Sequence, residues 1–136
     1  MAQARSEGAW MDHIKWLRTS YWVGAVADAV ATVAILIPSR MGESEFRYPM
    51  GLAAALMFAW TVLLIWADRR PVERRGVLLL TVFPLITGLM VSCVLAGSSG
   101  QLPMEQVVAR VVVLGIIAVL LLYSYARASR AIARTA

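Results

Sequence analysis

Cysteine and histidine are almost absent from this chain, which has one of each among its 136 residues. A single cysteine, Cys93, excludes an intramolecular disulfide and a cysteine-rich metal site. A single histidine, His13, excludes a bis-histidine haem site and a histidine-based metal centre within one chain. We therefore expect neither a metal ion nor a cofactor.

Charge is also scarce, since charged residues make up 15% of the chain and hydrophobic residues make up 60%. The mean hydropathy of +0.72 is far too high for an ordinary soluble domain of this length. No glycine-rich phosphate loop occurs, and no serine has a histidine base at membrane depth. The composition predicts a membrane protein that is not an enzyme.

Long apolar runs are abundant. About 20 apolar helical residues cross a hydrocarbon core roughly 30 Å thick. Four runs approach that length, at residues 21–38, 50–67, 76–97 and 107–125. The short joints between them are rich in charge or in glycine, serine and proline, which favours antiparallel neighbours. We predict an all-α, integral membrane four-helix up-down-up-down bundle that forms a single domain over residues 1–136.

Basic residues lie mainly on one side of this layout. The N-terminal arm, the joint between the second and third runs and the C-terminal tail hold ten of the 13. The joint and the tail contribute Arg69, Arg70, Arg74, Arg75, Arg127, Arg130 and Arg134. Positive residues stay inside, so we predict cytoplasmic N- and C-termini in a bacterial or archaeal cytoplasmic membrane. Binding of these arginines to anionic lipid headgroups explains the net charge of +5 without nucleic acid.

The segment before the first run has an amphipathic pattern. Trp10, Ile14, Leu17 and Tyr21 recur at helical spacing, with charged residues on other faces. This pattern predicts an interfacial helix over residues 9–20 that turns into the first span. The basic tail, 126–136, repeats the pattern with arginines on one helical stripe.

Small residues indicate where helices pack closely in lipid. The first three runs each have a stripe of them at helical spacing. These stripes are Gly24, Ala25, Asp28, Ala29 and Thr32; Gly51, Ala55 and Ala59; and Thr81, Pro84, Gly88 and Ser92. We expect each stripe to face a neighbouring helix.

Asp28, near the middle of the first run, is the strongest functional candidate. An ionised aspartate at the centre of a spanning helix costs about 2.5 to 3.5 kcal/mol, so a partner, water or a proton must compensate. Gly24 and Thr32 lie one turn either side, leaving room for a ligand below the carboxylate and a hydroxyl above it. One hypothesis is an acid that binds a proton, a cation or a small cationic substrate.

The other hypothesis for Asp28 is an interhelical lock to the third run, through Thr81, Thr87 or Ser92. Such hydrogen bonds average only about 0.6 kcal/mol, which favours the functional hypothesis. The predicted binding residues are accordingly Asp28, Thr32, Gly24, Thr81 and Thr87.

Two further features of the spans carry predictions. Arg110 lies about 9 Å outward of the centre of the fourth run at 1.5 Å per residue. It can snorkel to the interface near Glu43, Glu45 or Glu105, or turn inward to pair with Asp28. Pro84 removes a backbone hydrogen bond within the third run and could form a hinge there with Gly88.

The layout of four short spans with one acid in the first resembles that of small four-span exporters of lipophilic cations. The chain departs from them because its acid is Asp28 and not glutamate, and because its charge bias fixes one orientation. We predict an oligomeric transporter or channel for a proton, a cation or a small cationic substrate. Four slender helices leave little room for a pore, so a homo-oligomer is expected. The alternative is an accessory or assembly subunit of a larger membrane complex.

Overall fold

The computed structural model describes residues 2–37 and 47–133, and within these ranges its regular secondary structure is entirely helical. The elements are α1 (Ala2–Leu36), α2 (Arg47–Asp68), α3 (Gly76–Leu80), the π-helical segment η3 (Thr81–Ile86), α4 (Thr87–Ser98) and α5 (Met104–Ala133). Because α3, η3 and α4 follow one another directly, they form one long helical rod.

Four segments are long and apolar enough to cross a membrane: Ile14–Leu36, Arg47–Asp68, Gly76–Ser98 and Met104–Ala133. This confirms the prediction of a membrane protein built as a helical bundle. The last segment extends past the predicted end at residue 125, so Arg127 and Arg130 belong to α5 and not to a separate tail. Arg134 lies outside the described residues.

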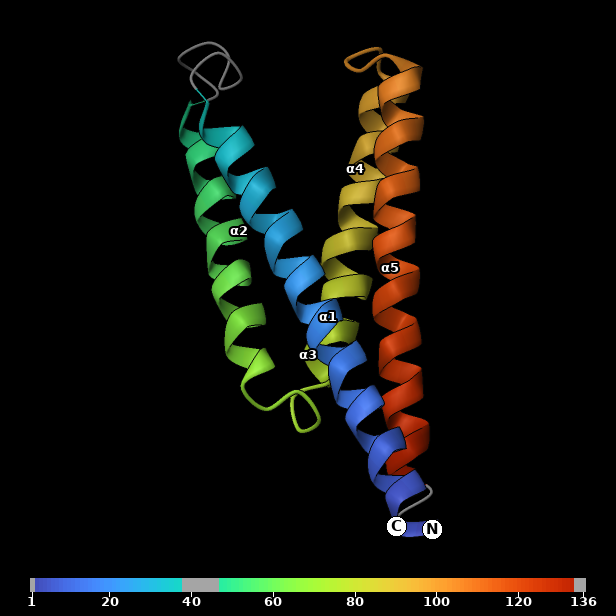
Figure 1. Cartoon of the computed structure of the whole chain (residues 1–136). Coiled ribbons are helices and arrows are strands. Elements are labelled where there is room, and N and C mark those ends of the chain that lie inside the picture. The colour runs from blue at the N-terminus through green and yellow to red at the C-terminus, as the bar shows by residue number, and fades with distance from the viewer. Residues whose placement is uncertain (1, 38–46, 134–136) are drawn as a thin grey trace.

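The helices form two pairs (Figure 1). One pair is α1 with α2, and the other is the α3–η3–α4 rod with α5. The two pairs meet where the N-terminal half of α1 packs on α5, and they diverge toward the opposite end, which carries the α4–α5 turn. The start of α1 and the end of α5 lie at the same end of the bundle, as four crossings require. We call this the terminal end, and the opposite one the turn end.

The backbone of α1 is continuous from Ala2 to Leu36. The predicted turn between an interfacial helix over 9–20 and the first span is therefore not present. A segment with helix-forming residues and no proline has no reason to break at the point where its apolar pattern changes. The location of this first part of α1 at a membrane interface stays a prediction.

The core lies where the two pairs meet. Leu17, Tyr21, Leu64, Leu78 and Leu121 come from all four helical rods and are almost completely buried. Two further contacts join α1 to α5 in this region. The hydroxyl groups of Ser20 and Ser124 share a buried hydrogen bond, and the rings of Trp16 and Tyr123 meet edge to face with centroids 5.8 Å apart. The terminal end is thus the most tightly connected part of the described chain.

The small-residue stripe of α1 faces the protein as predicted, since Gly24, Ala25, Asp28 and Thr32 are buried. The stripe of α2 does not, because Ala55 and Ala59 are exposed. The buried face of α2 consists instead of Ala54, Thr61, Leu64 and Ala67. The small residues on α1 leave room for the Leu64 side chain, so α2 does not need small residues of its own at this contact.

The predicted stripe of the third span is also wrong beyond its first member. Thr81 is buried, whereas Pro84, Gly88 and Ser92 are exposed. The buried residues beside Thr81 are Val82 and Ile86. Val82 and Ile86 pack in the hydrophobic core with Leu64 and Leu121, where larger apolar side chains bury more surface than small ones.

Pro84 lies inside the π-helical segment η3. Proline has no N–H to donate and its ring crowds the carbonyl four residues back, so a local change to wider turns relieves both problems. The hydroxyl of Thr87 donates to the carbonyl of Val82 at 3.0 Å, five residues earlier, and supports the wide turn. A hinge at Pro84 and Gly88 stays a prediction, and a Cβ at Gly88 would have no neighbour within 4 Å.

At the turn end, α4 and α5 come together at Gly97. A Cβ placed there would lie 2.7 Å from Cγ2 of Val107, closer than real carbon contacts allow. The absence of a side chain at Gly97 therefore lets the start of α5 approach α4, and the short connection over residues 99–103 suffices to join them.

Candidate functional site

The Asp28 carboxyl is buried in the membrane-spanning part of α1. The residue is 7% exposed and lies within the Ile14–Leu36 span. Its Oδ2 atom has no hydrogen-bond partner among the described residues. A buried polar atom without a partner is uncommon in folded proteins and calls for a physical explanation.

The Thr61 side chain on α2 lies close enough to the Asp28 carboxyl to interact with it. Thr61 is itself 6% exposed, and its hydroxyl also donates to the Met57 carbonyl at 3.1 Å. A hydroxyl has one proton, so Thr61 can donate fully either to Met57 or to Asp28 but not to both. The carboxyl therefore shares its donor with the backbone of α2.

Sequence reasoning missed Thr61, although a signal was available. It is the only residue with a hydroxyl group in the run 50–67. A lone polar residue in an otherwise apolar span tends to face the bundle interior, where its hydrogen bonds can be made.

Two of the predicted binding residues, Thr32 and Gly24, share the buried face of Asp28 but form no described contact with its carboxyl. Thr32 donates its hydroxyl to the main-chain carbonyl of Asp28 at 2.8 Å. Gly24 faces α2, where a Cβ would lie 3.2 Å from Cδ1 of Leu64. Leu64 thus lies in the space that the missing side chain of Gly24 leaves, and a ligand below the carboxylate stays a prediction.

The two predicted threonines of the third span have other partners. Thr81 donates to the Val77 carbonyl at 2.8 Å and accepts a hydrogen bond from the Trp60 indole at 3.2 Å. Thr87 is exposed, and its hydroxyl bonds to Val82 on its own helix. The polar neighbour of Asp28 is therefore on the second span and not on the third.

An open crevice lies between the two helix pairs toward the turn end, with a volume of about 450 Å³. Its walls come from α1, α2, α4 and α5, and we call it the outer crevice. The lining residues are Ala31, Ile35, Met57, Leu89, Cys93, Ala109, Arg110, Val113 and Leu114. Ala31 and Met57 lie three and four residues from Asp28 and Thr61, so the crevice begins about one helical turn from the carboxyl.

Among the residues that the structure describes, Arg110 is the only charged one that lines the outer crevice. It is exposed, and no ion pair joins it to Asp28 or to Glu105 within the described ranges. The other two predicted partners, Glu43 and Glu45, lie outside the described residues. The predicted pair between Arg110 and Asp28 is therefore not formed.

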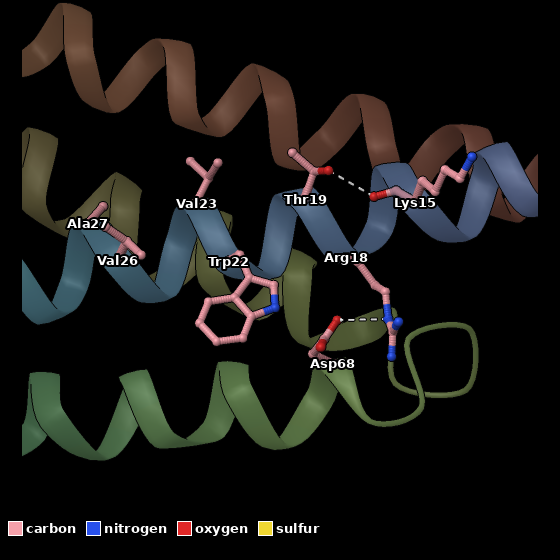
Figure 2. A pocket seen from close by; sticks show the side chains of 8 residues that line it. All are labelled: Lys15, Arg18, Thr19, Trp22, Val23, Val26, Ala27 and Asp68. Carbon is pink, nitrogen blue, oxygen red and sulfur yellow. Dashed lines mark hydrogen bonds and ion pairs between the residues drawn. The ribbon is translucent and has the colours of Figure 1, made fainter.

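A second, larger crevice lies beside α1 near the terminal end, with a volume of about 840 Å³ (Figure 2). Figure 2 shows Trp22 pointing from α1 toward α2, and Arg18 reaching Asp68 at the end of α2. The Arg18 Nε and Asp68 Oδ1 atoms are 3.5 Å apart. Charged groups at one end and Trp22, Val23, Val26 and Ala27 at the other give this crevice the polarity of a membrane interface.

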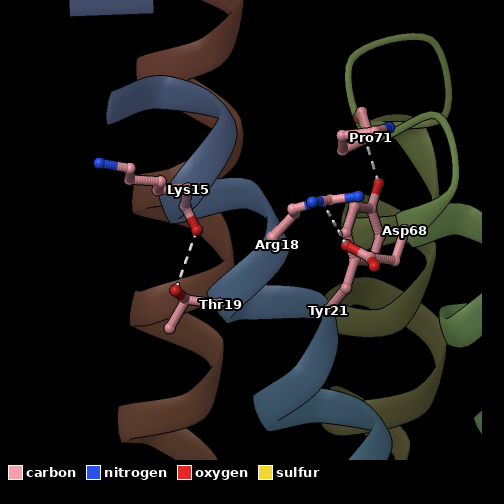
Figure 3. Close-up of polar contacts among 6 residues, drawn as sticks. All are labelled: Lys15, Arg18, Thr19, Tyr21, Asp68 and Pro71. Atoms are coloured by element: carbon pink, nitrogen blue, oxygen red, sulfur yellow. Dashed lines mark hydrogen bonds and ion pairs between the residues drawn. The ribbon is translucent and has the colours of Figure 1, made fainter. Parts of the chain in front are cut away.

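The loop between α2 and α3 is fastened to α1 through Tyr21 (Figure 3). The Tyr21 hydroxyl donates to the Arg74 carbonyl at 2.9 Å and lies 3.5 Å from the Pro71 carbonyl, the weaker acceptor of the two. The Arg74 guanidinium in turn lies over the Trp66 ring, 3.2 Å from its centroid, and donates to the Trp66 carbonyl. The loop is therefore a fixed part of the fold.

These contacts bear on the arginines predicted to bind lipid headgroups. Besides Arg74, Arg70 forms an ion pair with Glu73 at 3.3 Å, and Arg75 donates to the Val72 carbonyl at 3.1 Å. Arg69 is exposed at the end of α2. Three of the four loop arginines thus have contacts within the chain, and their binding to headgroups stays a prediction.

Comparison of the chain with protein-family models, with curated proteins and with solved structures finds no match. The features that bear on its function are therefore the buried acid and the two crevices.

Proposed function

We propose that this protein moves a proton or a small cation across the membrane, with Asp28 as the binding acid. The observation that carries the proposal is the buried Asp28 carboxyl, whose Oδ2 atom has no hydrogen-bond partner among the described residues. A buried carboxylate is stable only when a proton, a cation or a full set of donors compensates its charge. Thr61 offers a single, shared donor.

The outer crevice supports a route to the acid from one side. It begins about one helical turn from Asp28, and Ala31 and Met57 form its nearest walls. A small outward movement of α2 would join the crevice to the carboxyl. The hydroxyl of Thr61 would then turn from Met57 toward Asp28 and hold the carboxylate while its proton or cation is away. Thr81, Thr87 and the hinge at Pro84 and Gly88 would act only by shaping the rod beside it.

We further propose that the protein works as a homo-oligomer. The small residues Gly51, Ala55 and Ala59 of α2, of which Ala55 and Ala59 are exposed and Gly51 is half-buried, offer a surface on which a second copy can pack closely in lipid. We expect Ala55→Leu to lower energy transfer between differently labelled copies in vesicles, while Leu56→Ala, at an exposed neighbouring position, leaves it unchanged. Equal transfer in the wild type and Ala55→Leu would show that copies associate through another face.

The proposal places both termini in the cytoplasm of a bacterial or archaeal cell. This orientation is supported by the arginines of the loop 69–75 and of the end of α5. Arg69, Arg127, Arg130 and Arg134 would face anionic headgroups on that side.

The test is ion flux in proteoliposomes. Wild-type protein is reconstituted with a pH dye or a cation dye inside, and flux is driven by gradients of protons, sodium or potassium. Asp28→Asn should abolish flux while the protein remains folded, and Glu105→Gln, at the exposed start of α5, should retain it. The pH dependence of the carboxyl infrared band, with Asp28→Asn as the blank, checks proton binding at the same residue. Flux that survives in Asp28→Asn would overturn the proposal.

The second candidate function is an accessory subunit of a larger membrane complex. Leu64 fills the space at Gly24, and Thr61 gives the carboxyl a neighbour on α2, so Asp28 could serve only to hold α1 against α2. In that case the wild-type protein carries no flux, and Asp28→Asn pulls down the same membrane partners as the wild type because the amide keeps the hydrogen bond.

A further inference from the structure

We propose that the outer crevice holds an acyl chain of an anionic phospholipid, with the lipid phosphate bound by Arg110. This site would draw its ligand from the leaflet at the turn end of the bundle. It does not depend on ion movement through Asp28.

Most of the crevice lining fits the acyl chain of a lipid, and Arg110 fits its phosphate. Eight of its nine lining residues are apolar or weakly polar, and the ninth is the exposed cation Arg110. An acyl chain packs against such apolar walls, whereas a polar molecule that stayed there would lack hydrogen-bond partners. An ion on its way to Asp28 would only pass through the crevice when α2 moves outward. The apolar part of the crevice therefore selects a hydrocarbon chain.

The depth of Arg110 fits a phosphate at the edge of the bilayer. The residue lies six positions after Met104, the first residue of α5, which is about 9 Å along the helix at 1.5 Å per residue. An arginine side chain at that depth reaches the headgroup level by snorkelling, and its guanidinium binds phosphate with two parallel hydrogen bonds. Within residues 2–37 and 47–133, no acidic side chain forms an ion pair with Arg110.

The divergence of the two helix pairs explains why a lipid is needed at this place. The pairs separate toward the turn end (Figure 1), and the crevice is bounded by all four rods. Apolar side chains that border an empty space lack dispersion contacts on that side, and an acyl chain of the right width restores these contacts. A bound lipid would thus complete the packing of the outer half.

Cys93 makes the proposal testable, because it is the only cysteine of the chain and it lines the crevice. A fluorophore is attached to Cys93, and the protein is reconstituted in vesicles of phosphatidylcholine and phosphatidylglycerol. Either one lipid or the other carries bromine on its chains, at the same mole fraction, so the two vesicles have equal charge. The measured quantity is the ratio of quenching by the brominated anionic lipid to quenching by the brominated zwitterionic lipid.

We expect a ratio of about five for wild-type protein, the preference that one cation near the membrane surface confers. Arg110→Gln should lower the ratio to about one, and Arg110→Lys should keep only part of it, because the charge remains but the two parallel hydrogen bonds are lost. Asp28→Asn should leave it unchanged, which separates this site from the proposed transport function. The matched control carries the fluorophore at Val112→Cys in a Cys93→Ala background, since Val112 is exposed on α5 and does not line the crevice. There the ratio should stay near one.

Three results would overturn the proposal. The first is a ratio near one at Cys93 in the wild type, and the second is a ratio that persists in Arg110→Gln. The third is efficient joining of Cys93 to Cys93 by a short bifunctional maleimide in native membranes, which would mean that a second copy of the chain occupies the crevice.

Discussion

The Trp60 indole nitrogen of α2 donates a hydrogen bond to the Thr81 hydroxyl of η3, with 3.2 Å between the two atoms. The same hydroxyl donates to the Val77 carbonyl at 2.8 Å, so it is used both as donor and as acceptor. This contact crosses from the first helix pair to the second within the membrane-spanning part of the chain.

A double-mutant cycle on Trp60→Phe and Thr81→Val should show coupling. Hydrogen bonds between membrane helices average about 0.6 kcal/mol, so we expect a coupling free energy of about that size. Unfolding equilibria in mixed micelles of increasing denaturing detergent measure it. Trp22→Phe, at an exposed position on α1, controls for the loss of indole area. Purely additive effects of the two substitutions would contradict the hydrogen bond.

Asp28→Asn should make the protein more stable, even if it loses its activity. An unpartnered buried polar group destabilises a fold by about 1 to 3 kcal/mol, and the amide removes the charge and adds a donor. We expect the free energy of unfolding to rise by about 1 kcal/mol in the same detergent assay. Glu105→Gln, at an exposed site, should change it little. A less stable Asp28→Asn would mean that the carboxylate has a strong partner.

Gly97→Ala should destabilise the junction of α4 and α5. The new Cβ would lie 2.7 Å from Cγ2 of Val107, and valine in a helix has almost one rotamer, so it cannot turn away. Overpacking of this kind costs about 1 to 3 kcal/mol. The double variant Gly97→Ala with Val107→Ala should recover much of the loss. If the second substitution adds to the first, the two residues do not meet as described.

Both termini should be cytoplasmic, and single cysteines can test this. In a Cys93→Ala background, Ser99→Cys lies in the α4–α5 connection and Val72→Cys lies in the α2–α3 loop. An impermeant maleimide should label Ser99→Cys in intact cells and Val72→Cys only after the membrane is opened. The reverse pattern would show that the positive residues face outward.

The sequence predicted the number of spans and the buried face of α1 correctly. Length and apolar content decide whether a helix can cross a bilayer, and both are properties of one segment alone. The face of α1 could be predicted because Asp28 has to be buried and its glycine and threonine neighbours share its stripe.

The buried faces of the second and third spans could not be predicted from small residues. Ala55, Ala59 and Gly88 are exposed, while Leu64 and Ile86 are buried. Small residues show where two helices can approach closely. Which face of a helix packs depends also on the side chains of the partner helix, and the sequence of one segment does not contain that information. For the same reason the sequence favoured a partner for Asp28 on the third span, whereas the residue that interacts with its carboxyl is Thr61 on the second.

The contacts that join the two helix pairs are unevenly placed along the bundle. The hydrogen bonds of Ser20 with Ser124, Tyr21 with Arg74 and Trp60 with Thr81 all lie nearer the terminal end, and none of those described crosses between the pairs beside the outer crevice. Hydrogen bonds therefore hold the two pairs together at the terminal end, but none of those described does so at the turn end. The distance between the pairs at the turn end can change with bilayer thickness or lateral pressure without breaking a described hydrogen bond. Such a change would alter the surroundings of Asp28, so the lipid bilayer itself would act on this residue.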